Sequence, residues 1–542
     1  MPNEALAQIL ANMAFLAELK DENPFKVRAL ANASGIIGDL PTPVKELIAS
    51  GEIKKIPGIG KGTQAIAIEF SEKGTVSEFE KLKEGLPSSI LELKEVRGLG
   101  PKKIKTLYDQ LQIGSLSELE YACEENRLVD LKGFGEKTQA SILKNIKQLS
   151  GYRGKVILPV ALQEAEEAEE QLGGLKGVKR TERTGELRRH NEVLGSIDFL
   201  LEGDAKITGA SLEKAGFQIA SDDAWEKPSE RGLKIRAWLA DSSNFGSKWV
   251  ETTGPAEFVS GLGKISSAKS EEEVFSGHKK AFIPPECRDL GLVPKDLLNE
   301  ADIRGVFHLH TAWSDGKDSL EEMASAAVKL GYEYLGLSDH SQTAFYANGL
   351  DEKRVLEQKK EIEEVRKKFP DLRIFHGIES DILADGSLDY PAAFLLKNFD
   401  FVIASVHGQM KMNRDDMTKR LCRALENPAT TWLGHWTGRL LLGREGFDFD
   451  VEKVLKCAAK EGKSIELNSN PYRLDIDWRL LPRAVELGIS IGIHPDAHSA
   501  HGLADTRYGV WMARKAGLSA SQVVNTKTRK EMEAWLAERK TV

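Results

Sequence analysis

The chain has 542 residues, of which 41% are hydrophobic and 29% charged, a composition typical of a globular protein. Its length predicts about three or four domains, and its formal net charge of −8 argues against a broadly basic nucleic-acid-binding surface. No apolar run approaches the roughly 20 residues of a membrane span, and the N-terminus lacks the basic and apolar segments of a secretion signal. We therefore expect a cytoplasmic protein without a membrane partner, in which any contact with DNA is local.

The four cysteines are far apart in the sequence and match neither zinc-ligand nor disulfide spacing. They are Cys123, Cys287, Cys422 and Cys457. We interpret them as buried or incidental thiols of a reducing cytoplasm.

Residues 1–150 contain one short motif three times, in which apolar-x-Gly-apolar-Gly precedes a helical pattern. The copies are Ile56–Gly62, Val96–Lys103 and Leu131–Lys137. Two glycines allow a tight turn that brings backbone N–H groups close to a phosphate, and the following helix adds the positive end of its dipole. The candidate DNA-binding residues are Gly58, Gly60, Lys61, Gly98, Gly100, Lys102, Lys103, Gly133, Gly135 and Lys137. The alternative is that the turns are ordinary and the lysines form a solvated surface.

These repeats resemble the helix-hairpin-helix of DNA repair proteins, which grips the backbone without reading bases. The region as a whole resembles the N-terminal part of family X DNA polymerases. The resemblance implies a small helical DNA-binding domain over residues 1–85 and a fingers-like domain over residues 86–150. It also implies sequence-nonspecific binding to gapped, nicked or 3′-ended DNA.

Residues 185–200 resemble the active-site segment of the palm of the same polymerase family. The family pattern is Gly-Ser-x-Arg-Arg, a spacer, and Gly-Asp-Ile-Asp, of which Arg188, Arg189 and Asp198 are retained. Glu186 replaces the serine, and Ser196 replaces the first aspartate. The resemblance implies a palm over residues 151–250, a shortened thumb over 251–286 and a linker over 287–304.

The third aspartate of the family pattern is also missing. The best match to its strand is Leu233–Leu239, which places Arg236 at the aspartate position. Nucleotidyl transfer needs two divalent ions held by carboxylates, and one carboxylate cannot hold both. We therefore predict a palm that keeps its fold and has lost its chemistry. The alternative is a misalignment in which the true carboxylates are among Asp204, Asp222, Asp223 and Asp241.

After residue 300, seven short apolar runs each end in a side chain that can bind a metal. These side chains are His308 and His310, Asp339 and His340, Glu379 and Asp381, His407, His435, Asn468, and Asp496 and His498. Amphipathic helical patterns such as Leu320–Leu330 separate the runs, so the segment is predicted to be a series of parallel βα units. In a βα barrel the active site lies at the carboxyl ends of the strands, where all these groups would meet.

The side chains point to a metal site. Residues two apart on a strand share a face, so His308 and His310 can meet one cation. Imidazole and carboxylate together suit Zn, Mn or Fe. The alternative for any one histidine is a satisfied core residue, but nine of the eleven histidines of the chain follow residue 300. That clustering favours a multinuclear site.

These motifs, in this order, resemble the PHP (polymerase and histidinol phosphatase) domain over residues 305–542. The resemblance implies a distorted seven-stranded βα barrel with three divalent metal ions, Mn or Zn and possibly Fe. By that resemblance the first ion would be held by His308, His310, Glu379 and Asp496. The second would be held by Glu379, His407 and His435. The third would be held by Asp315, His340 and His498. Asp315, Glu379 and His407 are the expected catalytic residues.

Taken together, the resemblances imply an all-α helix-hairpin-helix region, an α+β nucleotidyltransferase palm and a C-terminal βα barrel. Close metal ions polarise a phosphoryl oxygen, lower the pKa of water and stabilise the leaving oxygen, so the predicted reaction is phosphate-ester hydrolysis. We expect a monomeric 3′–5′ DNA exonuclease of base-excision or gap repair. The alternatives are an active gap-filling polymerase with PHP proofreading, an apurinic-site endonuclease, a phosphomonoesterase, or a DNA-end scaffold without hydrolytic activity.

Overall fold

The computed structural model describes residues 3–38, 40, 42–129, 131–150, 154–229 and 233–539. The chain forms two compact units, residues 1–123 with 128–149, and residues 124–127 with 150–542. Within the described residues, no helix combines the length and the apolar character that crossing a bilayer requires.

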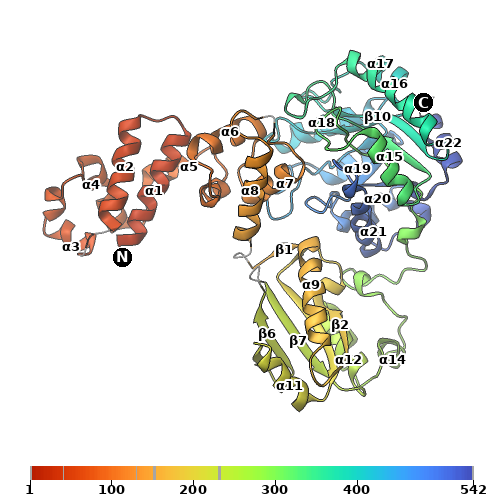
Figure 1. The fold of residues 1–542 in the computed structure, drawn as a ribbon, viewed down its shortest axis with the longest axis horizontal. Coiled ribbons are helices and arrows are strands. Elements are labelled where there is room, and N and C mark those ends of the chain that lie inside the picture. Colours follow the sequence, from red (N-terminus) through yellow and green to blue (C-terminus); the bar gives the residue numbers. More distant parts are fainter. Residues whose placement is uncertain are drawn as a thin grey trace. The chain divides into compact units, whose positions relative to one another are not determined.

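The first unit is all-α, as expected (Figure 1). Its helices are α1 Asn3–Leu19, α2 Pro24–Gly38, α3 Val44–Ala49, α4 Lys61–Lys73, α5 Ser77–Lys83, α6 Pro101–Leu111, α7 Leu116–Glu124 and α8 Glu136–Ser150. Two 3-10 helices, η1 Glu52–Lys55 and η2 Ser88–Glu95, precede the first two glycine turns.

The three glycine turns share one backbone geometry. The first glycine of each turn is left-handed, with φ of 87° at Gly58, 91° at Gly98 and 91° at Gly133. A side chain there would be strained, which explains the glycine. The residue after the second glycine begins a helix each time, namely α4, α6 and α8. The unpaired N–H groups of three helix starts therefore follow three matching turns.

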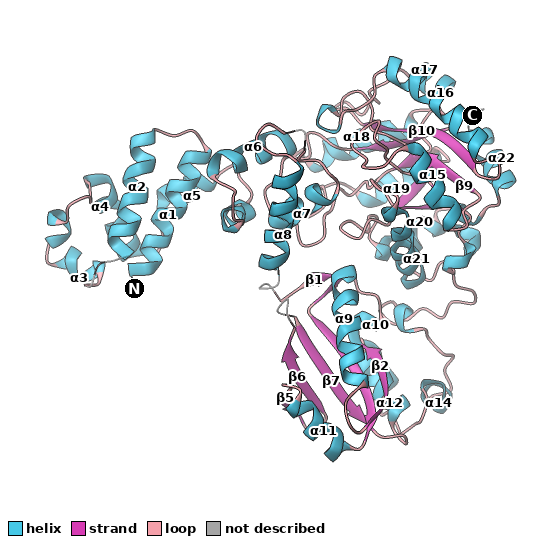
Figure 2. Ribbon diagram, viewed as in Figure 1, coloured by secondary structure: helices cyan, strands magenta, loops and turns pink. Residues whose placement is uncertain are grey.

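The second unit begins with a five-stranded sheet in the order β2-β4-β7-β6-β5 (Figure 2). Its strands are β2 Val178–Thr184, β4 Ser196–Gly203, β5 Gln218–Ser221, β6 Ala224–Pro228 and β7 Lys234–Ala240. A separate antiparallel pair joins β1 Val156–Ile157, which precedes β2, to β3 Val193–Leu194, which lies between β2 and β4 in the sequence. The accompanying helices are α9 Leu158–Gly173, α10 Gly185–Arg188, α11 Ala205–Lys214, α12 Phe245–Thr253, α13 Ala256–Leu262 and α14 Glu271–Gly277.

The C-terminal part of this unit is a seven-stranded parallel sheet in simple sequence order, from β8 to β14. The strands are β8 Gly305–Val306, β9 Tyr334–Leu337, β10 Arg373–Asp381, β11 Phe401–Ser405, β12 Trp432–Leu433, β13 Ser464–Asn468 and β14 Ile491–His494. The helices are α15 Leu320–Lys329, α16 Glu352–Lys368, α17 Ala392–Asn398, α18 Arg414–Glu426, α19 Val451–Lys460, α20 Leu481–Glu486, α21 Thr506–Lys515 and α22 Arg529–Arg539. The predicted alternation of strands and helices is confirmed.

The first and last strands nearly close the sheet into a barrel. Beyond their ends, His310 N donates to Ala497 O at 2.9 Å and Ala497 N donates to His308 O at 3.2 Å. At the other end of the seam the side chain of Asn525 takes the place of a strand. Its amide accepts from Ile493 N at 2.7 Å and donates to Gly305 O at 2.9 Å. The closure brings the two ends of the domain together at the site.

One cluster of apolar side chains, mostly aromatic, runs from the strands to α22. Phe307 packs edge-on against Phe401, with ring centroids 4.9 Å apart, and Trp432 stacks on Trp535 at 5.4 Å. All four side chains are buried in this cluster. Phe307 directly precedes the predicted ligand His308, so this apolar packing adjoins the candidate site.

One expectation about the cysteines is wrong. Cys422 and Cys457 form a disulfide, with Cα atoms 5.7 Å apart. They are 35 residues apart in the sequence, but they belong to α18 and α19, which pack against each other. Spacing along the chain carries no sign of such a pairing, because it depends on tertiary packing. Cys123 and Cys287 are free and buried.

Candidate metal centre

The predicted metal-binding side chains follow the barrel strands at one end. His308 and His310 come after β8, His340 after β9, and His407 after β11, while Glu379 lies on β10 near its carboxyl end. His435 follows β12, and Asp496 and His498 follow β14. Because the strands are parallel, their carboxyl ends meet at the same edge, and the structure brings all nine predicted ligands together there.

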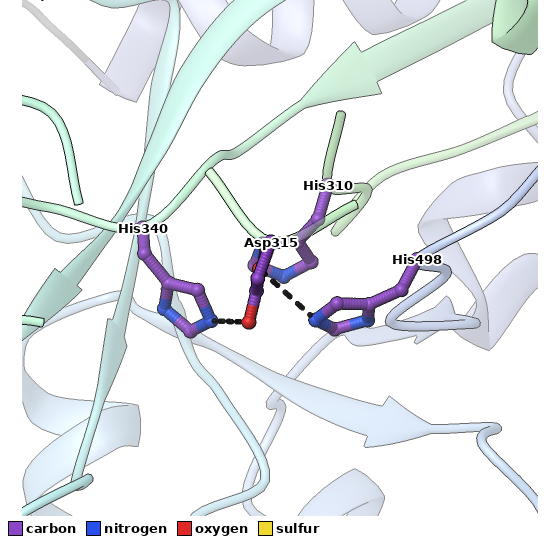
Figure 3. A group of neighbouring side chains, drawn as sticks. All are labelled: His310, Asp315, His340 and His498. Atoms are coloured by element: carbon purple, nitrogen blue, oxygen red, sulfur yellow. Dashed lines mark ion pairs between the residues drawn. The ribbon is translucent and has the colours of Figure 1, made fainter. Parts of the chain in front are cut away.

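Asp315 lies between two histidines from distant parts of the chain (Figure 3). Its carboxylate oxygens are 3.5 Å from His340 Nε2 and 3.4 Å from His498 Nε2. His310 Nδ1 approaches the same carboxylate at 3.7 Å. The four side chains converge on one point, although His310 and His498 are 188 residues apart in the sequence.

Glu379 is the centre of the rest of the cluster. One of its oxygens is 3.2 Å from His308 Nε2, 3.2 Å from His407 Nε2 and 2.8 Å from His435 Nε2. Its other oxygen is 3.1 Å from His340 Nδ1. With His310 Nε2 at 3.6 Å from the second oxygen, five imidazoles approach this one carboxylate.

The spacing of these atoms fits metal coordination. Two ligands that each lie about 2.1 Å from one ion are separated by about 3.0–3.4 Å, depending on the angle between them. The observed separations of 3.2 Å for His310–Asp496 and 3.4 Å for His308–Asp496 fall in that range. Among the described residues, several buried atoms of the cluster have no hydrogen bond of normal geometry. These are His308 Nε2, both ring nitrogens of His310, His340 Nδ1, His435 Nδ1, Asp315 Oδ2 and Glu379 Oε2.

The structure forms four groups of neighbouring side chains that could each hold an ion, and these groups share more residues than the three predicted ligand sets do. His310 joins Asp315, His340 and His498, besides lying with His308 and Glu379. Other groups combine His308 with His435 and Asp496, and His340 with Glu379 and His407. The geometry therefore assembles one continuous cluster, in which a ligand such as Glu379 can serve two neighbouring positions.

The electrostatics of the cluster favour bound cations. Burial opposes ionisation of Glu379, but the surrounding histidines, His407 foremost, hold the pKa of this carboxyl well below its usual value. Asp315 and Asp496 behave likewise, because burial is outweighed by neighbouring histidines. Burial alone would lower the pKa of His407, yet the adjacent carboxylates raise it to about 10. Buried carboxylates that stay anionic need positive charge beside them, which the histidines supply here and a bound divalent ion would supply in their place.

Three predicted ligands have a positive φ, which is uncommon for residues with a side chain. The φ angle is 60° at His308, 52° at Asp496 and 20° at His435. Such conformations persist when the surrounding structure holds them, and they concentrate at functional sites. Gly434, just before His435, is restricted in another way, because a Cβ there would lie 2.5 Å from Ile403 and Ser405 side-chain atoms.

The sequence prediction missed one carboxylate that contacts the predicted ligands, Glu466, and named another, Asp381, without giving it this role. Glu466, fully buried on β13, contacts His308 Nδ1 at 2.5 Å and accepts from the backbone N–H of His435 at 2.9 Å. Asp381 contacts His407 Nδ1 at 2.6 Å. A carboxylate on one ring nitrogen orients the other nitrogen toward a metal. The available signal was the alternation of side chains along the strand, because Glu466 is two residues from Asn468 and shares its face.

We expect Glu466→Gln to lower the affinity for metal by about 10- to 100-fold, because the amide cannot balance the charge of an oriented imidazole. The metal retained per chain after dialysis against a graded chelator series measures this. Glu445→Gln, at an exposed position, is the matched control. Equal metal retention by the two variants would show that Glu466 does not position His308.

The remaining histidines of this half lie outside the groups. His376, on β10, contacts Gln358 Oε1 at 3.1 Å through Nε2. His494 packs edge-on against Trp432, with ring centroids 4.9 Å apart. His501 is exposed on the 3-10 helix η7 His501–Asp505.

In the five-stranded sheet, two residues of the predicted degenerate polymerase site, Asp198 and Arg236, form a row across three strands with Glu226. The register pairs Asp198 on β4 with Arg236 on β7, and Arg236 with Glu226 on β6. Arg236 lies 3.5 Å from Asp198 and donates to Glu226 at 2.8 Å. Burial raises the pKa of Asp198, although Arg236 opposes the shift. A guanidinium thus stands between the two carboxylates.

The two consecutive arginines of the motif, Arg188 and Arg189, are also engaged in ion pairs. Arg188 donates to both oxygens of Glu271, at 2.9 and 2.7 Å. Arg189 donates to Asp289 at 3.1 Å, and the same carboxylate accepts from Lys515 at 2.6 Å. Ser196 donates to Asp198 at 2.9 Å, and Glu186 accepts from Gly195 N at 3.3 Å.

The four alternative aspartates do not join Asp198. Asp204 caps α11 six residues further along the chain, about 20 Å away along a strand. Asp241 follows the end of β7, and Asp223 accepts from Leu239 N at 2.9 Å near that same end. Asp222 precedes Asp223 in the turn between β5 and β6.

In the first unit, the predicted lysines lie in the first turns of α4, α6 and α8. Lys61, Lys102 and Lys137 are exposed. Lys103 is half-buried and donates to Gly98 O at 3.3 Å, within its own glycine turn.

Comparison with protein families matches three segments. A helix-hairpin-helix domain matches residues 1–76, a SAM-like helix-hairpin-helix tandem matches residues 90–148, and a PHP domain matches residues 307–470. The DNA polymerase/3′-5′ exonuclease PolX of Bacillus subtilis (strain 168) is 32% identical, and the match covers 99% of each chain. The chain belongs to the PolX family. The predicted family resemblance and the predicted fold are thereby confirmed.

A second kind of relative matches the barrel of this PolX-family protein alone. A probable phosphatase of Thermoanaerobacter sp. (strain X514) is 29% identical, over 43% of this chain and 94% of its own length. A probable phosphatase of Vibrio campbellii is 27% identical, over 40% of this chain and 86% of its own length. The barrel therefore also occurs without the helical and palm regions.

Proposed function

We propose that this PolX-family protein is a metal-dependent DNA phosphoesterase that removes nucleotides from 3′ ends in base-excision or gap repair in the cytoplasm. One observation carries the proposal, namely the convergence of nine metal-binding side chains at the carboxyl ends of the barrel strands. The helix-hairpin-helix repeats support DNA as the substrate, which we expect to be gapped, nicked or 3′-ended. The relative from Bacillus subtilis, named as a 3′-5′ exonuclease, supports the reaction. We also propose that the protein acts as a monomer.

We further propose that the cluster holds three divalent ions, Mn²⁺, Zn²⁺ or Fe²⁺. Imidazole and carboxylate ligands in this ratio suit all three metals. When bound, such ions polarise the phosphoryl group and stabilise the developing charge. Among the described residues, His308 Nε2 and both ring nitrogens of His310 are buried without a hydrogen bond of normal geometry, which supports this assignment.

The side chains of the chain would hold and orient that site. Glu379 spans the cluster, Asp315 joins His340 and His498, and His407 is held by Asp381. Glu466 orients His308 from the far side of the ring. We assign the catalytic roles to Asp315, Glu379 and His407, because each adjoins more than one neighbour in the cluster.

The proposal is tested with the purified protein, Mn²⁺ and gapped DNA labelled at the 5′ end. We expect a ladder of products shortened from the 3′ end, which disappears with EDTA. A single internal cut at an abasic site would instead assign an endonuclease, and release of phosphate alone would assign a phosphomonoesterase. An intact strand would refute the proposal.

We predict little or no templated synthesis by the palm. Arg236 occupies the space beside Asp198 where a cation would sit, and Arg188 and Arg189 are paired with carboxylates. Primer extension should be measured with the His308→Ala and His310→Ala double variant, so that degradation cannot mask synthesis. Robust extension at micromolar deoxynucleotides would contradict this prediction.

A gain-of-function variant tests whether the missing carboxylates cause the predicted lack of synthesis. Ser196→Asp combined with Arg236→Asp would restore two carboxylates and remove the guanidinium between Asp198 and Glu226. Some extension by this variant and none by the parent would identify the missing carboxylates as the reason for the inactivity.

A further inference from the structure

Four residues from the helical part of the sequence, Glu124–Arg127, belong to the second compact unit together with the barrel. Among them, Glu125 is only 7% exposed. Glutamate is rarely buried to this extent unless its carboxylate is paired, because burial removes the charge from water. The partners of Glu125 therefore indicate what its carboxylate does.

The carboxylate of Glu125 contacts two side chains that follow strands of the barrel. One of its oxygens is in direct contact with His498 Nδ1. The other accepts from the side-chain amide of Asn470 at 3.1 Å, in a contact buried from solvent. Asn470 follows β13 and His498 follows β14, and these two strands are neighbours in the sheet. Glu125 thus reaches the end of the barrel at which the predicted ligands gather.

Two contacts beside Glu125 hold the same segment in place. Lys317 donates to the backbone carbonyl of Glu124. The guanidinium of Arg127 lies over the ring of Tyr346, 4.8 Å from its centroid. The segment is therefore fixed on both sides of Glu125, and the carboxylate does not depend on its own side chain alone for its position.

The contact with His498 repeats an arrangement that the barrel contains twice. In two other predicted ligands, a carboxylate contacts Nδ1 while Nε2 faces the cluster. Those carboxylates are Glu466 and Asp381, and both lie on barrel strands. In His498, Nδ1 faces Glu125 and Nε2 lies 3.4 Å from Asp315 (Figure 3). A carboxylate on one ring nitrogen fixes the tautomer and turns the other nitrogen toward a metal.

We propose that Glu125 is a positioning residue, which orients His498 for the ion expected beside Asp315. The inference rests on the proposed function and adds to its metal centre a residue from outside the barrel sequence. Glu125 lies far before residues 305–542, so the motifs that predicted the ligands do not include it. The ion beside Asp315 should therefore depend on Glu125, whereas the ions beside Glu379 should not.

The first test measures metal binding by the full-length protein. Glu125→Gln removes the charge that orients the imidazole and keeps the size of the side chain. After loading with Mn²⁺ and dialysis against a graded chelator series, part of the metal should leave this variant with an affinity about 10- to 100-fold lower than in the parent. Glu125→Asp, which keeps the charge, should retain more of that metal than Glu125→Gln. Glu72→Gln, at an exposed position on α4, is the matched control and should retain metal like the parent.

A double-mutant cycle separates positioning from a structural effect. If Glu125 acts through His498, adding Glu125→Gln to His498→Ala should change neither metal retention nor the rate of 3′-end loss any further. In the parent background, Glu125→Gln should lower kcat about 10- to 100-fold and leave KM for gapped DNA within about twofold, because the carboxylate faces an imidazole. The absorption spectrum of bound Co²⁺ should change in Glu125→Gln and stay the same in Glu72→Gln. Thermal unfolding of the metal-free variants verifies that the fold is retained.

The outcomes separate this inference from the proposed function. If the parent protein shortens no 3′ end, the proposed function fails, and metal retention still tests the role of Glu125. If Glu125→Gln retains metal and the Co²⁺ spectrum of the parent, the positioning role is wrong. Losses that add in the double variant would also overturn it, since Glu125 would then act independently of His498.

Discussion

Replacing both His308 and His310 by alanine is expected to remove bound metal and to reduce degradation of DNA 3′ ends by about a thousandfold or more. The expected loss follows from the several kcal/mol of transition-state stabilisation that a metal ion supplies. Both rings are fully buried, and their nitrogens lie 3.2–3.6 Å from carboxylate oxygens of Glu379 and Asp496. Without these rings, the two carboxylates lose two imidazole neighbours, and a bound ion would lose two ligands. The measurements are metal per chain by plasma mass spectrometry and the rate of 3′-end loss in Mn²⁺.

The structure selects the control for this experiment. His501 is exposed and lies outside the groups, so His501→Ala should retain both metal and activity. His494 is a poorer control, because its buried ring packs against Phe307 and Trp432 and its removal would leave a cavity. A double variant that keeps full activity and full metal content would sink the assignment of the first ligand pair.

Several features of the fold were open to prediction because they depend on local rules. Parallel strands separated by helices follow from short apolar runs and amphipathic spacing. The glycine turns could be predicted because glycine readily adopts a left-handed φ, which Gly58, Gly98 and Gly133 have in the structure. The substitutions at two aspartate positions of the family motif were visible in the sequence, and the strand register pairs Asp198 with Arg236.

Other features depend on which distant segments come together. Glu466 meets His308 across 158 residues, and Asn525 seals a seam between the first and last strands. The disulfide between Cys422 and Cys457 requires α18 and α19 to be neighbours. The sharing of His310 between two ligand groups requires barrel closure. No spacing rule contains these contacts, because they arise only from tertiary packing.

The second large effect concerns how the protein would hold long DNA. Replacing Lys61, Lys102, Lys103 and Lys137 by alanine is expected to weaken binding to duplex DNA at least about a hundredfold at 0.1 M salt. Each phosphate neutralised contributes a slope of about −0.9 in log K against log salt, so the slope should become shallower by up to about 3.6. Turn N–H groups and lysines carry no base code, so the loss should be the same for any sequence. Fluorescence anisotropy over a salt series measures both quantities.

A matched set of lysines in the same unit distinguishes the glycine turns from general charge. The control substitutes Lys73, Lys81, Lys83 and Lys144, which lie later in their helices or away from the turns. Both sets remove the same charge, but only the first removes it beside helix N-termini, where N–H groups and the dipole already favour a phosphate. Neither set belongs to the barrel, so hydrolysis of a small phosphodiester should stay at the parent rate. Equal weakening by the two sets would mean that the chain holds DNA by diffuse charge. Within the turn set, Lys103 should contribute least, because its ammonium already donates to Gly98 O.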